Sequence, residues 1–295
     1  MGKKYEFFLK KNFEIFYYDK KKIIKKNFLK NLKNIRKQNF LFSIISTPAN
    51  THKYYAKIMV NNDINFLVEK PLSIKTEGWK SIIEDIKQKK LICCVAYPRR
   101  NAEAYNYIKN LIYKKKIIGK LKIIRTNYSQ DFRKYRKDYK KIYYASKKTG
   151  GGIVFDALTH HLNLITFFGG SIKNIKVFKK NLEIKNVKVP DTSLLEIKLK
   201  NGIYAFIFGN QFQKPNVDEI EMIGTKGNLK FDRIQNNIFY LTEYKSILIK
   251  KFKESYEDMF KKQITNYINS IKNKIPVSTR LDEEFTNIKK INLAL

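Results

Sequence analysis

Three consecutive glycines, Gly150 to Gly152, stand directly before an apolar run that carries Asp156 and His160. A helix predicted over residues 153–168 would place these two side chains on one face, one turn apart. A carboxylate beside an imidazole can orient the ring and stabilise its protonated form, as a proton-transferring pair requires. A purely structural role is the commoner one for a histidine on a helix, so the spacing leaves both interpretations open. His161 would point away from this face, which favours a structural role for it.

The first 100 residues alternate between strand and helix patterns. Near-continuous apolar runs of this kind are typical of strands buried in a parallel sheet. The alternation predicts an α/β domain over residues 1–100, Rossmann-like and doubly wound, with ligands at the carboxyl ends of the strands. The predicted strands cover residues 12–19, 40–46, 64–69 and 91–97, and the predicted helices cover residues 3–11, 20–37, 52–61 and 76–89.

The chain beyond residue 100 is rich in strand patterns. Asn201-Gly202 between two alternating runs is a hairpin signal, and a basic, tyrosine-rich loop over residues 133–148 leads into the glycines. We predict an α+β substrate-binding and oligomerisation domain over residues 101–295, with a large, mainly antiparallel sheet and helices on one face. Its predicted helices cover residues 102–116, 153–168 and 256–272, and its predicted strands cover residues 120–128, 172–178, 193–200, 203–210, 219–224, 228–232 and 237–241.

The composition predicts a folded cytoplasmic protein. Hydrophobic residues make up 43% of the chain, which is ample material for a core. It has no apolar run of 18 residues, so we expect no membrane partner, and the first residues lack the apolar region of a signal peptide. Cys93 and Cys94 are neighbours in a predicted strand and should point to opposite faces, so we expect buried thiols and no metal site.

The formal net charge of +35 suggests nucleic-acid binding, but the kind of charge argues against it. The excess is almost wholly lysine spread along the chain, with only eight arginines. Asn, Ile, Phe and Tyr are also abundant, and codons rich in A and T favour all of these residues. Because base and phosphate recognition favours the arginine fork, we expect no nucleic-acid partner. The alternative predicts a nucleic-acid affinity that falls steeply with salt.

Five segments together resemble the Gfo/Idh/MocA family, named for glucose–fructose oxidoreductase and myo-inositol dehydrogenase. They occur in the family's order and extend the resemblance over about residues 12–290. Residues 133–152 are also similar to members found among bacterial surface-sugar biosynthesis enzymes. The five segments are Ser46-Thr-Pro-Ala-Asn-Thr-His52, Val68-Glu-Lys-Pro-Leu72, Tyr97-Pro-Arg-Arg100, Gly150-Gly-Gly with Asp156-x-x-x-His160, and Ile223-Gly-Thr-Lys-Gly-Asn-Leu229.

The resemblance implies an NAD(P)-dependent oxidoreductase that interconverts a hydroxyl and a ketone on a sugar, sugar nucleotide or cyclitol. Lys70 would lie near the nicotinamide and the reacting oxygen, where an ammonium stabilises a developing alkoxide. His160 would pass the proton and Asp156 would orient it. Tyr97 and Arg100 correspond to substrate-side positions, although a core tyrosine and a surface arginine are equally open interpretations. The resemblance also implies a homo-oligomer formed through the C-terminal sheet.

The cofactor implied is NAD, with NADP as the other candidate. Asp19, at the end of its predicted strand, is the residue type that bonds a ribose 2′-hydroxyl, and its charge would repel a 2′-phosphate. A polar strand cap (Asp19) and a helix N-terminal residue (His52) are the alternative interpretations. The expected cofactor-binding residues are Asp19, Thr47, Pro48, Asn50, His52, Glu69, Lys70 and Pro71.

The chain departs from the family at its start. The first strand and its Gly-x-Gly-x-x-Gly turn are absent, since Gly2 is the only glycine before Asp19. That turn brings backbone N–H groups to the pyrophosphate. We expect either a recorded start that omits roughly 20–25 residues of a βα unit, or a degenerate, non-catalytic relative that binds a sugar or partner protein without normal cofactor binding.

Overall fold

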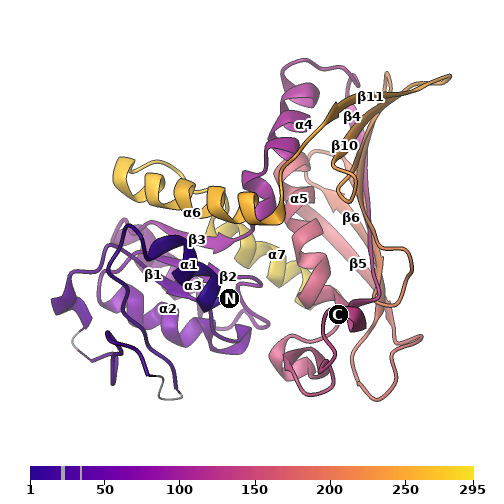
Figure 1. Ribbon diagram of the computed structural model, residues 1–295. Helices are drawn as coiled ribbons and strands as arrows, with labels where there is room; N and C mark the ends of the chain where they lie inside the picture. The colour runs from indigo at the N-terminus through magenta and orange to yellow at the C-terminus, as the bar shows by residue number, and fades with distance from the viewer. Residues whose placement is uncertain (21–23, 34) are drawn as a thin grey trace.

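The computed structural model describes residues 1–20, 24–33 and 35–295, which form two sheets with helices packed around them (Figure 1). The smaller sheet contains β1 (Ser43–Ile45), β2 (Phe66–Glu69) and β3 (Cys93–Ala96), in that order and all parallel. Helix α2 (His52–Asn61) connects the first two strands and α3 (Trp79–Gln88) connects the second pair. Every residue of β2 and β3 is buried, as expected for a parallel sheet covered on both faces. The predicted Rossmann-like sheet is confirmed.

Each face of this sheet has its own core. Helices α2 and α3 cover one face, where Trp79 and Cys93 are buried. Two helices from opposite ends of the chain cover the other face: α1 (Gly2–Leu9) and α6 (Tyr256–Asn273), with Cys94 among them. The two cysteines therefore point to opposite faces and are free thiols, as the strand pattern predicts.

The segment between α1 and β1 is where the predictions from sequence are wrong. No strand forms over residues 12–19, because Tyr17 makes only a single bridge to Phe28 and has no neighbouring ladder. Of the helix predicted over residues 20–37, residues 21–23 and 34 lie outside the described part. The remaining residues are irregular except for a 3-10 turn, Ile35–Gln38. Ile24, on the expected apolar stripe, is fully exposed, whereas Ile35 of the same stripe is buried in the core of the small sheet. The stripe is therefore not buried along one continuous face, which a helix there would need for its stability.

The larger sheet has eight strands in the order β11-β10-β9-β8-β4-β7-β6-β5. All neighbours are antiparallel except β4 and β7, which confirms the mainly antiparallel prediction. The predicted hairpin joins β6 to β7, with Gly202 at φ +86°. β11 was not predicted. The strands are β4 (Leu121–Ser129), β5 (Ile172–Lys180), β6 (Thr192–Leu199), β7 (Tyr204–Asn210), β8 (Val217–Gly224), β9 (Asn228–Asp232), β10 (Asn237–Leu241) and β11 (Ser246–Lys251).

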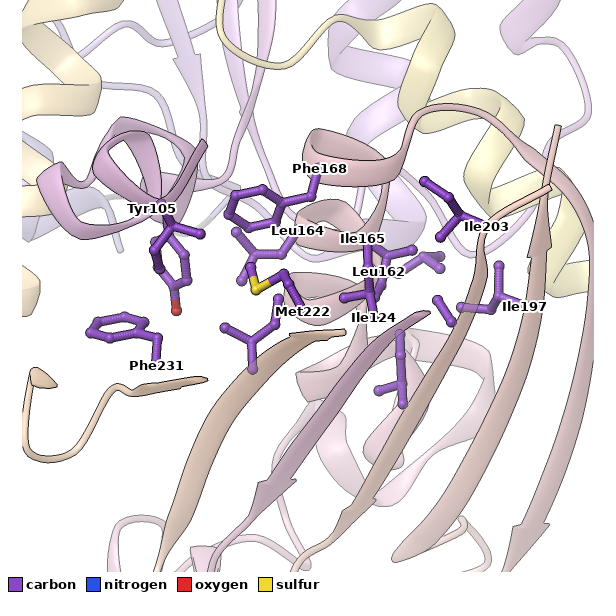
Figure 2. Close-up of a cluster of buried hydrophobic side chains, with 14 of the residues drawn as sticks. Tyr105, Ile124, Leu162, Leu164, Ile165, Phe168, Ile197, Ile203, Met222 and Phe231 are labelled. Atoms are coloured by element: carbon purple, nitrogen blue, oxygen red, sulfur yellow. The ribbon is translucent and has the colours of Figure 1, made fainter. Parts of the chain in front are cut away.

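Helices α4 (Glu103–Tyr113) and α5 (Thr159–Gly169) lie against one face of the large sheet (Figure 1). Their apolar side chains interdigitate with the inward side chains of the strands (Figure 2). In Figure 2, Leu162 and Ile165 of α5 lie over Ile124 of the central strand. This single core fixes α5, and with it the segment that carries Asp156 and His160.

The last helix, α7 (Leu281–Ala294), links the two halves and was not predicted. It contacts α3 and β3 of the small-sheet layer and α5 and β5 of the large-sheet layer. Helices α6 and α7 both follow residue 100 in sequence, yet both pack against the first sheet. Over the described part of the chain, none of the helices has the length and apolar character needed to cross a membrane.

Candidate active site

The three glycines form a turn that no other residue fits at its centre. A Cβ on Gly151 would lie 2.0 Å from the Tyr144 carbonyl oxygen, and Gly150 and Gly152 have φ values of +83° and +84°. The Gly151 N–H donates to the Ser146 carbonyl oxygen at 2.8 Å. The turn thus ties the loop over residues 131–149 to the start of the helix that carries Asp156.

Asp156 lies in a single π-helical turn, Val154–Leu158, directly before α5. Its carboxylate accepts hydrogen bonds from Arg136 Nη1 at 3.1 and 3.2 Å and from the Tyr143 hydroxyl at 2.5 Å. Among the described residues no hydrogen bond joins this carboxylate to His160. The direct pair expected from the spacing is not formed, because a guanidinium and a phenol are stronger donors to a carboxylate than a neutral imidazole.

Lys70 bridges the two halves of the molecule at this point. It follows β2 directly, and its Nζ donates to the Asp156 carbonyl oxygen at 2.6 Å. Its peptide bond to Pro71 is cis. Burial lowers the pKa of Lys70, and the nearby carboxylates of Asp156 and Glu69 oppose that shift. The structure therefore brings Lys70 and Asp156 together from positions 86 residues apart.

His160 is partly buried one turn after Asp156. Its Nδ1 is buried and has no hydrogen-bond partner in the described part of the chain. Its ring meets the ring of Tyr97 edge-on, with 5.5 Å between centroids. Burial, followed by the positive charges of Lys70 and Arg99, holds the pKa of His160 well below its ordinary value. The imidazole is therefore held in its neutral form.

Several of the expected cofactor residues line the loops at the carboxyl ends of β1 and β2. Thr47 is partly exposed, and Pro48 and Asn50 are exposed, in the loop after β1. His52 is buried instead, with Nε2 2.8 Å from the Thr47 carbonyl oxygen and Nδ1 3.1 Å from that of Pro71. His52 thus holds the two loops together rather than presenting its ring to a ligand.

Two other expected cofactor residues occupy unexpected surroundings. Glu69 is buried and accepts a hydrogen bond from the Tyr5 hydroxyl of α1 at 2.7 Å. Burial raises the pKa of its carboxyl. Asp19 is exposed in an irregular segment, near enough to Tyr55 to act on its phenol, and does not end a strand.

The N-terminus of α1 lies close to the end of β1. A Cβ built on Gly2 would lie 3.4 Å from Ser46 Oγ, so the helix begins at the carboxyl end of β1. The first turn has no side-chain cap, and its N–H groups and positive dipole end favour an anion. Together with Lys70 at the end of β2, this arrangement fits a dinucleotide lying across the carboxyl ends of the strands.

The two expected substrate residues, Tyr97 and Arg100, form hydrogen bonds in the region between the two sheets, which we call the joint. Arg100 donates to Asn163, Thr166, Ser278 and Glu283, which uses all five of its N–H groups. Tyr97 and Glu284 are both buried, and the Tyr97 hydroxyl donates to Glu284 Oε1 at 2.6 Å. Both side chains are thus occupied by other residues, including acceptors on α7 that the sequence pattern did not reveal, and of the two open interpretations of Tyr97 this arrangement fits a core tyrosine. A contact of Arg100 with the substrate stays a prediction.

Three side chains near the site were not anticipated: Arg99, Arg136 and Tyr143. Arg99 forms a bidentate ion pair with buried Asp218, at 2.9 and 2.6 Å, and contacts His161 Nε2 at 3.3 Å. His161 is therefore structural, as expected.

The rarity of arginine in the sequence was the signal that could have pointed to Arg99 and Arg136. Seven of the eight arginines form ion pairs with carboxylates, so an arginine in this lysine-rich chain marks a specific contact.

Known proteins resemble this chain in sequence and in fold. It is 27% identical over 192 residues to Oxidoreductase P35 of Formosa agariphila, a match that spans 63% of this chain and 58% of that protein. It is 22% identical over 242 residues to myo-inositol 2-dehydrogenase of Thermotoga maritima, spanning 79% of this chain and 70% of that enzyme. Levoglucosan dehydrogenase, in complex with NADH and levoglucosan, has a TM-score of 0.77 at 16% identity, covering 91% of this chain and 82% of that one.

Two family descriptions match consecutive parts of the chain. Residues 5–97 match an oxidoreductase family with an NAD-binding Rossmann fold, and residues 105–230 match the GFO/IDH/MocA C-terminal domain. These spans correspond to the layer around the small sheet and to the core of the large sheet. The resemblance, the Rossmann-like fold and the NAD cofactor class are thereby confirmed. The chain belongs to the Gfo/Idh/MocA family of oxidoreductases.

Proposed function

We propose that this protein is an NAD-dependent oxidoreductase that interconverts a hydroxyl and a ketone on a sugar, sugar nucleotide or cyclitol. The myo-inositol and levoglucosan dehydrogenases that it resembles support this substrate class. The observation that carries the proposal is the hydrogen bond of 2.6 Å from Lys70 Nζ to the Asp156 carbonyl oxygen. It places a cation from the NAD-binding domain beside the segment that holds Asp156 and His160.

The residues divide the proton transfer between them. When bound, NAD supplies the hydride acceptor or donor. Lys70, as an ammonium, donates a hydrogen bond to the reacting oxygen and stabilises negative charge on it. His160, kept neutral by burial and by neighbouring cations, accepts the hydroxyl proton. Asp156 is held ionised, since Lys70 and Arg136 overcome the effect of its burial and lower its pKa.

The test combines a binding measurement with a turnover measurement. Titration with NADH and NADPH, followed by nicotinamide fluorescence, should show saturable binding with NADH preferred. Sugars and cyclitols, including myo-inositol and levoglucosan, are then screened for NAD⁺ reduction by absorbance. With the substrate so found, His160→Asn should lower turnover by about 10²- to 10⁴-fold, the usual contribution of a general base.

A matched pair of lysine variants controls for the loss of positive charge. Lys70→Met should abolish turnover, whereas Lys75→Met removes an exposed lysine five residues on and should leave it unchanged. Unfolding curves for each variant establish that the fold is intact. Wild-type turnover in a folded His160→Asn variant would contradict the assignment of His160 as the general base.

A non-catalytic relative that binds a sugar or partner protein is the second candidate. The position of Asp19 favours it, because an exposed irregular segment does not hold a ribose-binding carboxylate at a strand end. The NADH titration separates the two candidates. A folded protein that binds a sugar but no nicotinamide nucleotide would establish the second.

We further propose that two copies associate through the open face of the large sheet. Phe178, Leu194 and Phe208 lie directly opposite one another on β5, β6 and β7, and all three are exposed. Tyr204 and Phe206 extend this apolar patch along β7. Sedimentation should show a dimer or larger assembly, and Phe208→Lys should shift it toward monomer. A monomeric wild-type protein at micromolar concentration would contradict this association.

A further inference from the structure

The loop over residues 131–149 is a rigid platform, not a loose connection. Phe132 and Tyr144 are buried in a small core of their own, with 4.3 Å between ring centroids. The Tyr144 hydroxyl also donates to Gln211 Oε1, and Asp131 pairs with Arg133 and Lys214. This platform presents Arg136 and Tyr143 to the Asp156 carboxylate.

Arg136 differs from the two other arginines near the site because some of its nitrogen donors form no hydrogen bond in the described part of the chain. Arg99 uses both terminal nitrogens on Asp218, and Arg100 uses all five N–H groups. Arg136 binds its partners through Nη1 alone, so Nε and Nη2 have no partner in the described part of the chain. Its side chain is 36% exposed, against 11% for Arg99 and 5% for Arg100.

The unused edge of the guanidinium suits one kind of ligand. Nε and Nη2 are two parallel donors, the geometry that binds a carboxylate or phosphate in bidentate fashion. The Arg136 guanidinium carbon lies 5.3 Å from the centroid of the Tyr143 ring, a cation–π contact that favours this position of the guanidinium. The surroundings attract anions as well, since residues 133–148 hold eight lysines or arginines and one acid.

We propose that Arg136 binds an anionic group of the substrate, a carboxylate or a phosphate, through its Nε and Nη2 edge. This inference rests on the proposed function, because it places the group next to Lys70 and Asp156. The substrate is then an acidic sugar: a sugar acid, a sugar phosphate or a nucleotide-linked sugar. Arg136 sorts substrates by charge, while Lys70 and His160 act on the hydroxyl.

The experiment measures binding of three probes with related sugar rings by calorimetry. D-glucuronate carries a carboxylate, glucose 1-phosphate carries a phosphate, and D-glucose is the neutral reference. The wild-type protein should bind at least one anion roughly 10-fold or more tightly than glucose, the effect of a charge-assisted hydrogen-bonded pair. Whichever anion binds identifies the source of the charge.

Variants show whether the effect belongs to the fork of Arg136. Arg136→Gln should remove the preference for the anion over glucose, and Arg136→Lys should retain only part of that preference. Lys137→Gln removes the same charge from the adjacent exposed position and should retain the preference. Tyr143→Phe disturbs the same carboxylate but keeps the guanidinium, so it too should still prefer the anion.

Three results would overturn the proposal: equal binding of all three probes, an unchanged preference in Arg136→Gln, or no saturable binding of either anion. NADH titration of the same samples keeps this failure distinct from failure of the proposed function. Nicotinamide binding without a preference for the anion would contradict only the proposed role of Arg136. Anion binding without nicotinamide binding would contradict the proposed oxidoreductase function but would support the anion site at Arg136.

Discussion

The joint between the two sheets and the candidate active site contain similar side chains in opposite states. In the joint, Arg100 uses every N–H group and the Tyr97 hydroxyl is bonded to Glu284. In the site, Arg136 has an unused edge and His160 Nδ1 has no partner among the described residues. Side chains whose donors are all used hold a structure together, whereas the partly exposed, unused edge of Arg136 is available to a ligand.

The largest expected effect lies in the joint. Arg100→Met should lower the free energy of unfolding by about 3–5 kcal/mol, since it leaves Glu283 and the buried oxygens of Asn163 and Thr166 without their donor. Arg36→Met removes an exposed arginine from its pair with Asp63 and should cost less than about 1 kcal/mol. Urea unfolding compares the two. Equal decreases in the free energy of unfolding would contradict the proposed difference between Arg100 in the joint and an ordinary surface ion pair.

A smaller effect comes from Glu284, which is 2% exposed. Burial raises its pKa to about 7, against the hydrogen bonds from Tyr97 and Asn287 that lower it. The folded protein thus keeps a proton that the unfolded chain releases near 4.5, so stability falls as pH rises from about 4.5 to 7. Between pH 5 and 8 the loss amounts to about 2 kcal/mol.

Glu284→Gln should abolish that part of the pH dependence, and urea unfolding at pH 5 and 8 measures it. The comparison must be a difference from wild type, because His161 acts in the other direction. Burial and the charge of Arg99 lower the pKa of His161 to about 3, so its contribution is lost as pH falls below about 6.5. Parallel pH profiles for the variant and the wild type would show that Glu284 does not titrate in the joint.

The fold was predictable where local pattern and tertiary environment agree. Strands of the large sheet alternate with period two because one face packs on α4 and α5, and helix α2 has the predicted bounds, residues 52–61. Residues 12–19 have the same β-forming composition but no neighbouring ladder, so composition alone predicted a strand wrongly. Whether a partner strand exists is not a local property.

The parts of the site that lie close together in the sequence could be predicted. The glycine turn, Asp156 and His160 are contiguous, and the Glu-Lys-Pro segment placed Lys70 at the end of a strand. Their catalytic roles stay predictions. Arg136 was missed because its partner is 20 residues away across an irregular loop. His52 and Arg100 were assigned to ligands because their actual partners are set by tertiary packing. These partners are main-chain carbonyls for His52 and, for Arg100, chiefly side chains of α5 and α7.

Because α6 packs against the first sheet, the order of synthesis affects how the NAD-binding domain folds on the ribosome. Phe260, Ile264 and Tyr267 cover the face that Leu67, Cys94 and Ala96 present. A ribosome adding 5–20 residues each second needs roughly 10–30 s to pass from the third strand to the end of that apolar stripe. During that interval only α1 is available to cover this face of the sheet, so the core on this side is completed only after α6 has been synthesised.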